Sequence, residues 1–179
     1  MILKIEELSH ENLKDFHKID NSFEVSSVLE LGMVKGEITY EIRELSEVWE
    51  KKYGNSQGFD PARLIDSKNG VIFLAYLENQ IAGRIVLKKN WNKYAYIDDI
   101  AVDRSLRRRG IGRQLLSAAI RWAREKNFPG LMLETQNINV GGCKLYDSLG
   151  FQLGGFDKLL YKAIKPPREE IALYWYLIF

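Results

Sequence analysis

The alternation of apolar and polar residues along the chain predicts a series of short strands. Apolar runs bounded by Gly, Pro, Asn or Asp are typical of strands, because these bounding residues favour turns. By this criterion we expect strands over residues 2–8, 71–77, 81–87, 94–102, 131–134, 151–163 and 171–179, the last two separated by Lys165-Pro166-Pro167-Arg168. A hairpin is expected over residues 25–45, which contain Gly32 and Gly36.

Three helices are predicted between these strands. Apolar residues recur at helical spacing from Ile111 to Ala123, and the Pro129-Gly130 pair stops that helix. A second helix is expected over 139–149, ending at Gly150, and Ser9 is expected to cap a third over 11–19. The order of elements, with a strand–helix–strand unit at 95–135, predicts an α/β (α+β) fold with a mixed sheet and one domain spanning 1–179.

Composition excludes several classes of protein. The chain has 179 residues, of which 46% are hydrophobic and 28% charged, as expected for a globular protein rather than a disordered one. No apolar run approaches the roughly 18 residues of a membrane span, and the acidic start lacks a signal-peptide core. One cysteine and two histidines provide neither an internal disulfide nor a metal cluster. We therefore expect a cytoplasmic protein with no membrane partner and no metal.

Charge is distributed unevenly along the chain. The formal net charge is only +2, yet residues 1–60 hold 7 basic and 13 acidic residues, whereas residues 61–179 hold 19 and 11. The first segment therefore carries −6 and the second +8. Such a split indicates two ligand surfaces of opposite sign, or simply two differently charged solvated faces.

The segment between the strand at 94–102 and the following helix carries the densest chemical signal. It contains Arg107-x-x-Gly110-x-Gly112. Glycines let a ligand approach backbone amides closely, and the N-terminus of a helix attracts anions. Arginine adds full positive charge and bidentate contacts to phosphate, from Arg107, Arg108, Arg109 and Arg113. We expect a phosphate-binding turn here, although a solvated basic loop or a nucleic-acid contact also fits these residues alone.

Two common phosphate motifs do not fit this turn. A P-loop needs Gly-Lys followed by Ser or Thr, and the chain has Gly112-Arg113 instead. A dinucleotide fingerprint needs a third glycine where Leu115 stands. The turn does resemble the acetyl-CoA signature of the GNAT superfamily of N-acetyltransferases. The segment Asn139-x-x-Gly142-x-x-Leu145-Tyr146-x-x-Leu149-Gly150-Phe151 resembles the second cofactor-side motif of that superfamily, except that Gly142 stands where alanine is common.

A closer resemblance extends over nearly the whole chain. The segments 89–102, 130–136 and 175–177, together with the opening 21–25, are similar to the streptothricin acetyltransferases of bacteria. This resemblance implies acetyl-CoA as cofactor, a small cationic antibiotic as substrate, and direct transfer of acetyl to its β-lysine amine. It also implies a mostly antiparallel twisted sheet with flanking helices and a splayed central pair of strands.

The same resemblance assigns expected roles to individual residues. Tyr146 matches the general acid that protonates the leaving thiolate, and Asn139 matches a contact to the pantetheine arm. The backbone around Val102 would pair with that arm and stabilise the oxyanion. Cofactor contacts are thus expected at Ile100, Ala101, Val102, Arg107, Arg108, Arg109, Gly110, Ile111, Gly112, Arg113, Asn139 and Tyr146. Cys143 lacks a neighbouring histidine in sequence and is expected to pack rather than react.

The chemistry of the acceptor amine requires a carboxylate. An alkyl ammonium with a pKa of about 10.4 is neutral in about one part in two thousand at pH 7, so deprotonation costs about 4.6 kcal/mol. Asp98 and Asp99 are the candidate bases, acting directly or through water. On a regular strand they point to opposite faces, with Asp98 on the side of Ile100 and Val102, although a bulge would let both reach one site.

A cationic substrate also needs carboxylates and aromatic faces. The expected substrate contacts are Trp91, Tyr94, Asp98, Asp99, Glu134, Tyr40 and Glu41. Alternatives left open by the sequence are a polyamine, aminoglycoside or protein amine as acceptor, a non-catalytic acetyl-CoA or nucleic-acid binding module, and a homodimer. The near-neutral overall charge and the lack of a basic aromatic stripe argue against nucleic acid.

Overall fold

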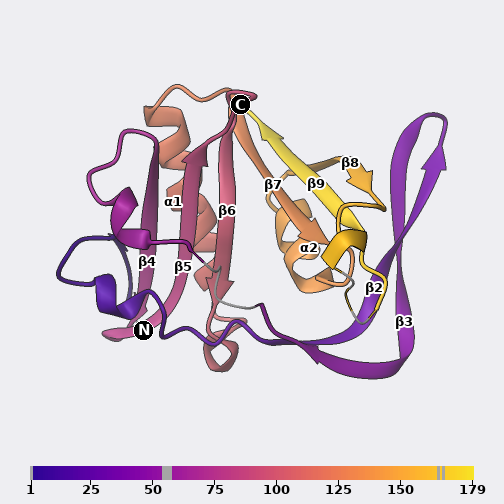
Figure 1. The fold of residues 1–179 in the computed structure, drawn as a ribbon, viewed down its shortest axis with the longest axis horizontal. Helices are drawn as coiled ribbons and strands as arrows, with labels where there is room; N and C mark the ends of the chain where they lie inside the picture. The colour runs from indigo at the N-terminus through magenta and orange to yellow at the C-terminus, as the bar shows by residue number, and fades with distance from the viewer. Residues whose placement is uncertain (1, 54–57, 165, 167) are drawn as a thin grey trace. The chain divides into compact units, whose positions relative to one another are not determined.

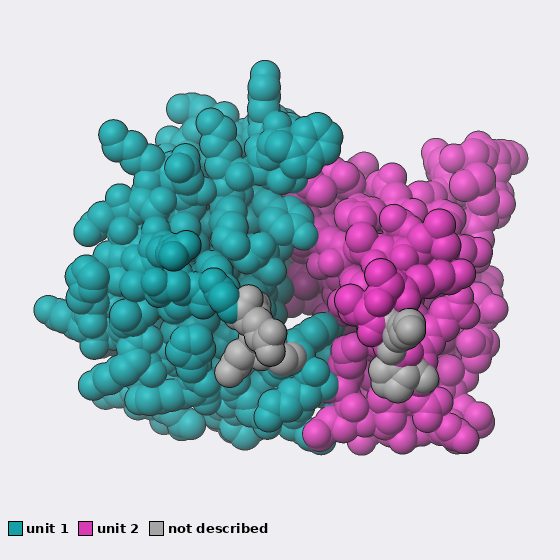
Figure 2. All heavy atoms as spheres, viewed as in Figure 1, with its two compact units in different colours: residues 1–23, 52–131, 179 teal, residues 24–51, 132–178 magenta. Residues whose placement is uncertain are grey.

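The computed structural model describes residues 2–53, 58–164, 166 and 168–179. The chain forms two compact units, coloured separately in Figure 2. Unit 1 comprises residues 1–23, 52–131 and 179, and unit 2 comprises residues 24–51 and 132–178. Each unit contains its own strands and one α-helix (Figure 1).

The strands of unit 1 form an antiparallel array in the order β1-β4-β5-β6. Their bounds are β1 Leu3–Glu7, β4 Gly70–Leu77, β5 Gln80–Lys89 and β6 Ala95–Val102. Glu78 and Asn79 join β4 to β5 with positive φ angles of 49° and 68°. Two left-handed residues give the tight turn whose twist matches that of the flanking strands. A tight turn therefore separates the two predicted strands 71–77 and 81–87.

Both faces of this array are covered. Helix α1 (Ile111–Glu125) packs on one face, where Ile111 and Leu115 approach the backbone of Gly83. The other face holds a cluster of buried side chains, formed by Leu8, Phe16, Ile72, Leu74 and Val86. The 3₁₀ helices η1 (Leu13–Asp15) and η2 (Pro61–Leu64) cover this cluster. A strand buried on both faces explains why 71–77 and 81–87 are continuously apolar rather than alternating.

Unit 2 contains a smaller sheet and a long two-stranded ribbon (Figure 1). The sheet has the order β7-β9-β8, with β8 and β9 antiparallel. The ribbon turns at Lys35-Gly36, both with positive φ, as a hairpin requires. The bounds are β2 Phe23–Val34, β3 Glu37–Lys51, β7 Gly130–Gln136, α2 Val140–Asp147, β8 Gln152–Asp157 and β9 Ala172–Ile178, with short 3₁₀ helices η3 Arg104–Leu106 and η4 Lys162–Ile164.

The predicted class, α/β with a mostly antiparallel sheet and flanking helices, is confirmed, and each predicted strand has a counterpart. The single domain and the splayed strand pair stay predictions. No helix in the described ranges is long and apolar enough to cross a membrane.

Two predicted elements are wrong in extent. The helix expected over 11–19 is reduced to η1, because the Asn12 side chain accepts a hydrogen bond from Ser9 N and donates to Glu7 O, which competes with helix formation. The strand expected over 151–163 ends at Asp157, whose carboxylate accepts from the amides of the following turn. Of the proline-containing connection expected next, positions 165 and 167 lie outside the described residues.

Candidate active site

Arg107 fixes the start of the predicted phosphate turn in unit 1. Its Nε donates to Val102 O at 3.1 Å, so the side chain folds back against the end of β6. The guanidinium is half-buried, and this burial lowers its pKa. Arg107 therefore holds the turn to the strand, a structural contact that the sequence motif does not distinguish from a phosphate contact.

Gly110 and the residues around it form an open cradle at the N-terminus of α1. Gly110 adopts φ +80°, and a Cβ at this position would meet no atom within 4 Å. It is the N-cap of α1 without a capping side chain, and the helical bonds begin with Gln114 N donating to Gly110 O at 3.1 Å. The preceding amides of a helix lack intrahelical acceptors and attract anions.

Two arginines beside this cradle carry accessible charge. Arg108 and Arg109 are exposed, and neither forms an ion pair with any residue that the structure describes. Arg108 has a φ of +64°, a conformation that non-glycine residues adopt rarely. A cradle of amides flanked by free guanidinium groups fits a phosphate ligand.

A β-bulge interrupts β6 at the two candidate carboxylates. Asp99 lies opposite Val86 on β5, and Ile97 lies opposite Leu87, so Asp98 is an extra residue without a direct partner. Such bulges redirect side chains and are frequent beside active sites. The bulge is not visible in the sequence, because Asp98-Asp99 fits a regular strand equally well.

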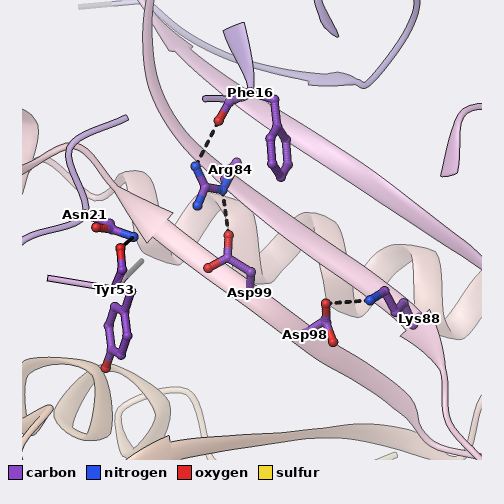
Figure 3. A network of polar contacts seen from close by, with 7 residues as sticks. All are labelled: Phe16, Asn21, Tyr53, Arg84, Lys88, Asp98 and Asp99. Atoms are coloured by element: carbon purple, nitrogen blue, oxygen red, sulfur yellow. Dashed lines mark hydrogen bonds and ion pairs between the residues drawn. The ribbon is translucent and has the colours of Figure 1, made fainter. Parts of the chain in front are cut away.

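Both carboxylates form ion pairs with cations of β5 (Figure 3). Asp99 Oδ2 lies 2.6 Å from Arg84 Nε, and Asp98 Oδ2 lies 2.6 Å from Lys88 Nζ. Each cation also stacks on an aromatic ring: Arg84 on Phe16 and Lys88 on Phe59, both at 4.6 Å from the centroid. The result is two parallel arrangements of carboxylate, cation and ring.

The face on which Asp98 lies differs from the regular-strand expectation. Directly paired residues share a face, so Val102 faces α1 together with Gly83, and Ile100 together with Ile85. Lys88 and Arg84 instead contact rings on the opposite face, and both carboxylates reach them. Asp98 therefore does not share the side of Ile100 and Val102, because the bulge shifts the alternation by one residue.

The side chain of Asn139 in unit 2 caps the N-terminus of α2, the helix of the second motif. Its Oδ1 accepts from Gly142 N at 3.1 Å, and its Nδ2 donates to Thr135 Oγ1 at 3.1 Å. A Cβ at Gly142 would lie 2.8–3.0 Å from the Asn139 side chain. The glycine that departs from the family pattern therefore makes room for this cap.

Tyr146 lies in an aromatic environment in unit 2. Its side chain is 3% exposed, and its ring lies 5.8 Å from Phe151 and 6.3 Å from Trp175. One helical turn earlier, Cys143 is 1% exposed, and burial raises the pKa of its thiol to about 12. The buried Nε1 of Trp175 has no hydrogen-bond partner among the residues that the structure describes. The interpretation of Cys143 as a packing residue is supported.

Glu134 on β7 belongs to a hydrogen-bonded chain. Its Oε1 accepts from the Tyr161 hydroxyl, which in turn accepts from Gln136 Nε2 at 3.0 Å. Burial raises the pKa of Glu134, the Tyr161 hydrogen bond opposes this, and the charge of Glu170 adds to it. Glu170 is itself buried and pairs with Lys51 at 2.5 Å. Glu134 is therefore half-buried and partly satisfied by hydrogen bonding within the protein.

The remaining predicted substrate residues belong to both units. In unit 2, Tyr40 packs edge-on against Trp175 at 5.9 Å, and its pKa is raised by burial and then by Asp147, while Glu41 is exposed. In unit 1, Trp91 is 91% exposed and Tyr94 half-buried in the turn between β5 and β6, at the end of β6 opposite the arginine turn. The structure does not bring these two near that turn.

Asn137 is a residue that sequence reasoning missed. It is 6% exposed, and its side chain donates to Leu29 O at 3.4 Å and accepts from Ile171 N at 2.9 Å. Its backbone bonds the same two residues. Asn137 thus ties the ribbon and β9 to the end of β7, two residues before Asn139. Its polar side chain next to the motif was the only available signal.

The sequence and the fold are each similar to those of known proteins. A family model described as acetyltransferase (GNAT) family matches residues 38–151, which include the arginine turn, the bulge and α2. The chain belongs to this acetyltransferase family. The predicted superfamily and enzyme class are confirmed.

Individual relatives extend the match to the full chain. The GNAT chain is 39% identical over 179 residues to streptothricin acetyltransferase A of Bacillus subtilis, covering 100% of both. A solved structure assigned as a streptothricin acetyltransferase of Bacillus anthracis, in complex with acetyl coenzyme A, has a TM-score of 0.92 and 46% identity, covering 99% and 100% of the two chains. A nourseothricin acetyltransferase, at 24% identity and a TM-score of 0.81, shows the shared fold.

Proposed function

We propose that the protein transfers an acetyl group from acetyl-CoA directly to the β-lysine amine of streptothricin, and so confers resistance to this antibiotic. The observation that carries the proposal is the similarity to streptothricin acetyltransferase A, which covers 100% of both chains at 39% identity. Relatives of a different substrate class match smaller parts of the chain, such as N-alpha-acetyltransferase 30 of Homo sapiens at 44% coverage.

The arginine turn fits the phosphates of the cofactor. Acetyl-CoA supplies its acetyl group as an activated thioester. The amides that follow Gly110 and the unpaired guanidinium groups of Arg108 and Arg109 would hold its phosphates. The backbone of β6 from Ile100 to Val102 would align the pantetheine arm. Asn139, which caps α2, is proposed as a further contact to that arm.

Asp98 is the better candidate to receive the substrate amine. Arg84, the partner of Asp99, has an 11% exposed side chain and also donates to Phe16 O at 2.9 Å, so Asp99 is held in a fixed network. The two carboxylates are almost equally exposed, Asp98 at 35% and Asp99 at 34%, but Lys88, the partner of Asp98, is 35% exposed and donates one hydrogen bond, so the Asp98 pair is held less firmly. Asp98 orients the ammonium, and water beside it carries the released proton to solvent. The relay provides the path for the proton, while the deprotonation at pH 7 still costs about 4.6 kcal/mol.

Tyr146 is the proposed donor of the proton that neutralises the departing thiolate. Its enclosure by Phe151 and Trp175 keeps bulk water from the hydroxyl, so that a phenolic proton is delivered locally. Tyr146→Phe should lower kcat by about 10²-fold or more with little change in acetyl-CoA affinity. Tyr176→Phe, on β9, is the matched control and should retain kcat.

Further substrate contacts are proposed at Glu134, Tyr40 and Glu41 in unit 2, and at Trp91 and Tyr94 in unit 1. These residues offer carboxylates and rings to a polycation. The location that goes with this function is the cytoplasm, whose reducing conditions suit the lone Cys143. The cofactor phosphates account for the arginine turn, so the proposal includes no nucleic-acid partner, and a homodimer stays a prediction.

The proposal is tested by following CoA release with a panel of amines. Streptothricin should give saturable release at a kcat/KM far above that of spermidine, an aminoglycoside and a peptide with a free N-terminus. Release with one of these other amines, and none with streptothricin, would replace the antibiotic as substrate while leaving the acetyltransferase class intact.

A further inference from the structure

The two carboxylate–cation pairs of β5 and β6 differ in how firmly they are held (Figure 3). Arg84 makes a hydrogen bond to Asp99 at 2.6 Å, a second to Phe16 O at 2.9 Å, and a stacking contact with Phe16. Its planar group is therefore held by three contacts and is largely buried. Lys88 has one hydrogen bond, to Asp98, and its side chain is 35% exposed. The Lys88–Asp98 pair is the one that solvent can open.

The surroundings of the Lys88 ammonium have the composition of a site for a primary alkyl ammonium. A carboxylate oxygen of Asp98 lies 2.6 Å from Nζ, and the face of Phe59 lies 4.6 Å from it. A carboxylate and an aromatic face are the two groups that bind an organic cation in water. The β-lysine moiety of the proposed substrate ends in the same functional group as the Lys88 side chain.

We propose that Lys88 occupies the substrate ammonium site of Asp98 in the free enzyme and leaves it when the cationic substrate binds. The inference rests on the proposed function, and it adds a specificity-determining residue to it. Lys88 places one positive charge at the site, so an amine must compete for Asp98. A monocation gains little by the exchange, whereas a polycation makes further contacts that the lysine cannot match.

The exchange of Lys88 for the substrate ammonium makes and breaks no covalent bond, and it changes the affinity for streptothricin only modestly. An ion pair of half-exposed groups contributes weakly to stability, because water screens the charges. Removing the Lys88 charge should therefore tighten streptothricin binding by about two- to five-fold, the range that such pairs provide. Lys88→Met keeps an unbranched apolar side chain of similar length and removes the positive charge.

The test is calorimetric titration of the purified full chain with streptothricin, without acetyl donor. Lys88→Met should lower the Kd by about two- to five-fold, while the neighbouring Lys89→Met should change it less. Lys89 is exposed and carries the same charge, so it reports the long-range effect of removing one cation. In an Asp98→Asn background, Lys88→Met should no longer tighten binding.

Three results would overturn the exchange: equal effects of Lys88→Met and Lys89→Met, weaker binding by Lys88→Met, or an undiminished effect in the Asp98→Asn background. Thermal unfolding checks that each variant folds. Turnover of streptothricin by the unmodified protein is measured separately. If Lys88→Met lowers the Kd as expected but the unmodified protein does not acetylate streptothricin, the proposed function is overturned and the exchange stands. If the unmodified protein acetylates streptothricin but Lys88→Met does not lower the Kd, the exchange is overturned and the proposed function stands. The absence of both streptothricin binding and turnover would overturn both proposals.

Discussion

The adjacent glycines of α2 provide a prediction with a built-in control. An Ala replacing Gly inside a helix usually stabilises it by up to about 1 kcal/mol, because Gly loses more backbone freedom on folding. Gly141 is exposed, and a Cβ there would meet no atom within 4 Å. Gly141→Ala should therefore raise the free energy of unfolding by about 0.5–1 kcal/mol.

Gly142→Ala should behave differently although it lies one residue further on. The new Cβ would lie 2.8 Å from Asn139 Nδ2 and 2.9 Å from Oδ1. The short Asn139 side chain is held by Gly142 N and Thr135 Oγ1, so relief of the clash breaks the cap. Loss of an N-cap costs about 1 kcal/mol, which cancels the helix gain or exceeds it. The expected change is zero or a loss of about 1 kcal/mol.

Urea unfolding followed by circular dichroism measures both variants. The two changes in unfolding free energy should differ by about 0.5–2 kcal/mol, and the difference should shrink in an Asn139→Ala background, which has no cap to displace. Equal stabilisation by Gly141→Ala and Gly142→Ala would refute the packing argument. It would mean that Gly142 is an ordinary weak point of the helix.

Three further outcomes are expected. The thiol of Cys143, with its pKa raised to about 12 by burial, should resist alkylation in the native protein at pH 8 and react once unfolded; rapid native labelling would contradict its burial. Asn137→Ala should lower the unfolding free energy by about 1–3 kcal/mol in urea titration, because Leu29 O and Ile171 N lose their side-chain partner, and a neutral effect would show that water replaces it. Burial raises the pKa of Glu134 above its ordinary 4.5, so the folded state holds this proton more tightly than the unfolded state does. The resulting stabilisation of the folded state is complete below pH 4.5 and is lost as the pH rises through the raised pKa. Glu134→Gln should accordingly become more favourable relative to the unmodified protein as pH rises from about 4 to 8, and a pH-independent difference would contradict the shift.

The fold could be predicted largely because its strongest signals are local. Continuous apolar runs marked β4 and β5, and Glu78-Asn79 marked their turn. Helix α1 begins after Gly110, where the glycine pattern indicates it. The side chains of Asn12 and Asp157 accept hydrogen bonds from backbone amides and so compete with regular secondary structure. At these two places the pattern of apolar residues overestimated the length of the element.

The site could be predicted in residue types more than in geometry. The motif identified Arg107, but its side chain holds β6 rather than facing outward. The bulge at Asp98 depends on strand register, a long-range property, so the shared face of the two carboxylates could not be deduced from their order in the sequence. Asn137 escaped notice because its partners Leu29 and Ile171 lie 108 and 34 residues away along the chain.

The measurement that bears most directly on the central claim is mass spectrometry of streptothricin after incubation with the protein and acetyl-CoA. The expected product carries one added acetyl group, about 42 Da, on an amine of the β-lysine moiety. We further predict that Tyr146→Phe slows formation of this product strongly while Tyr176→Phe does not. Unmodified streptothricin after complete incubation, with acetyl-CoA shown to be bound, would contradict the assignment of this antibiotic as the substrate.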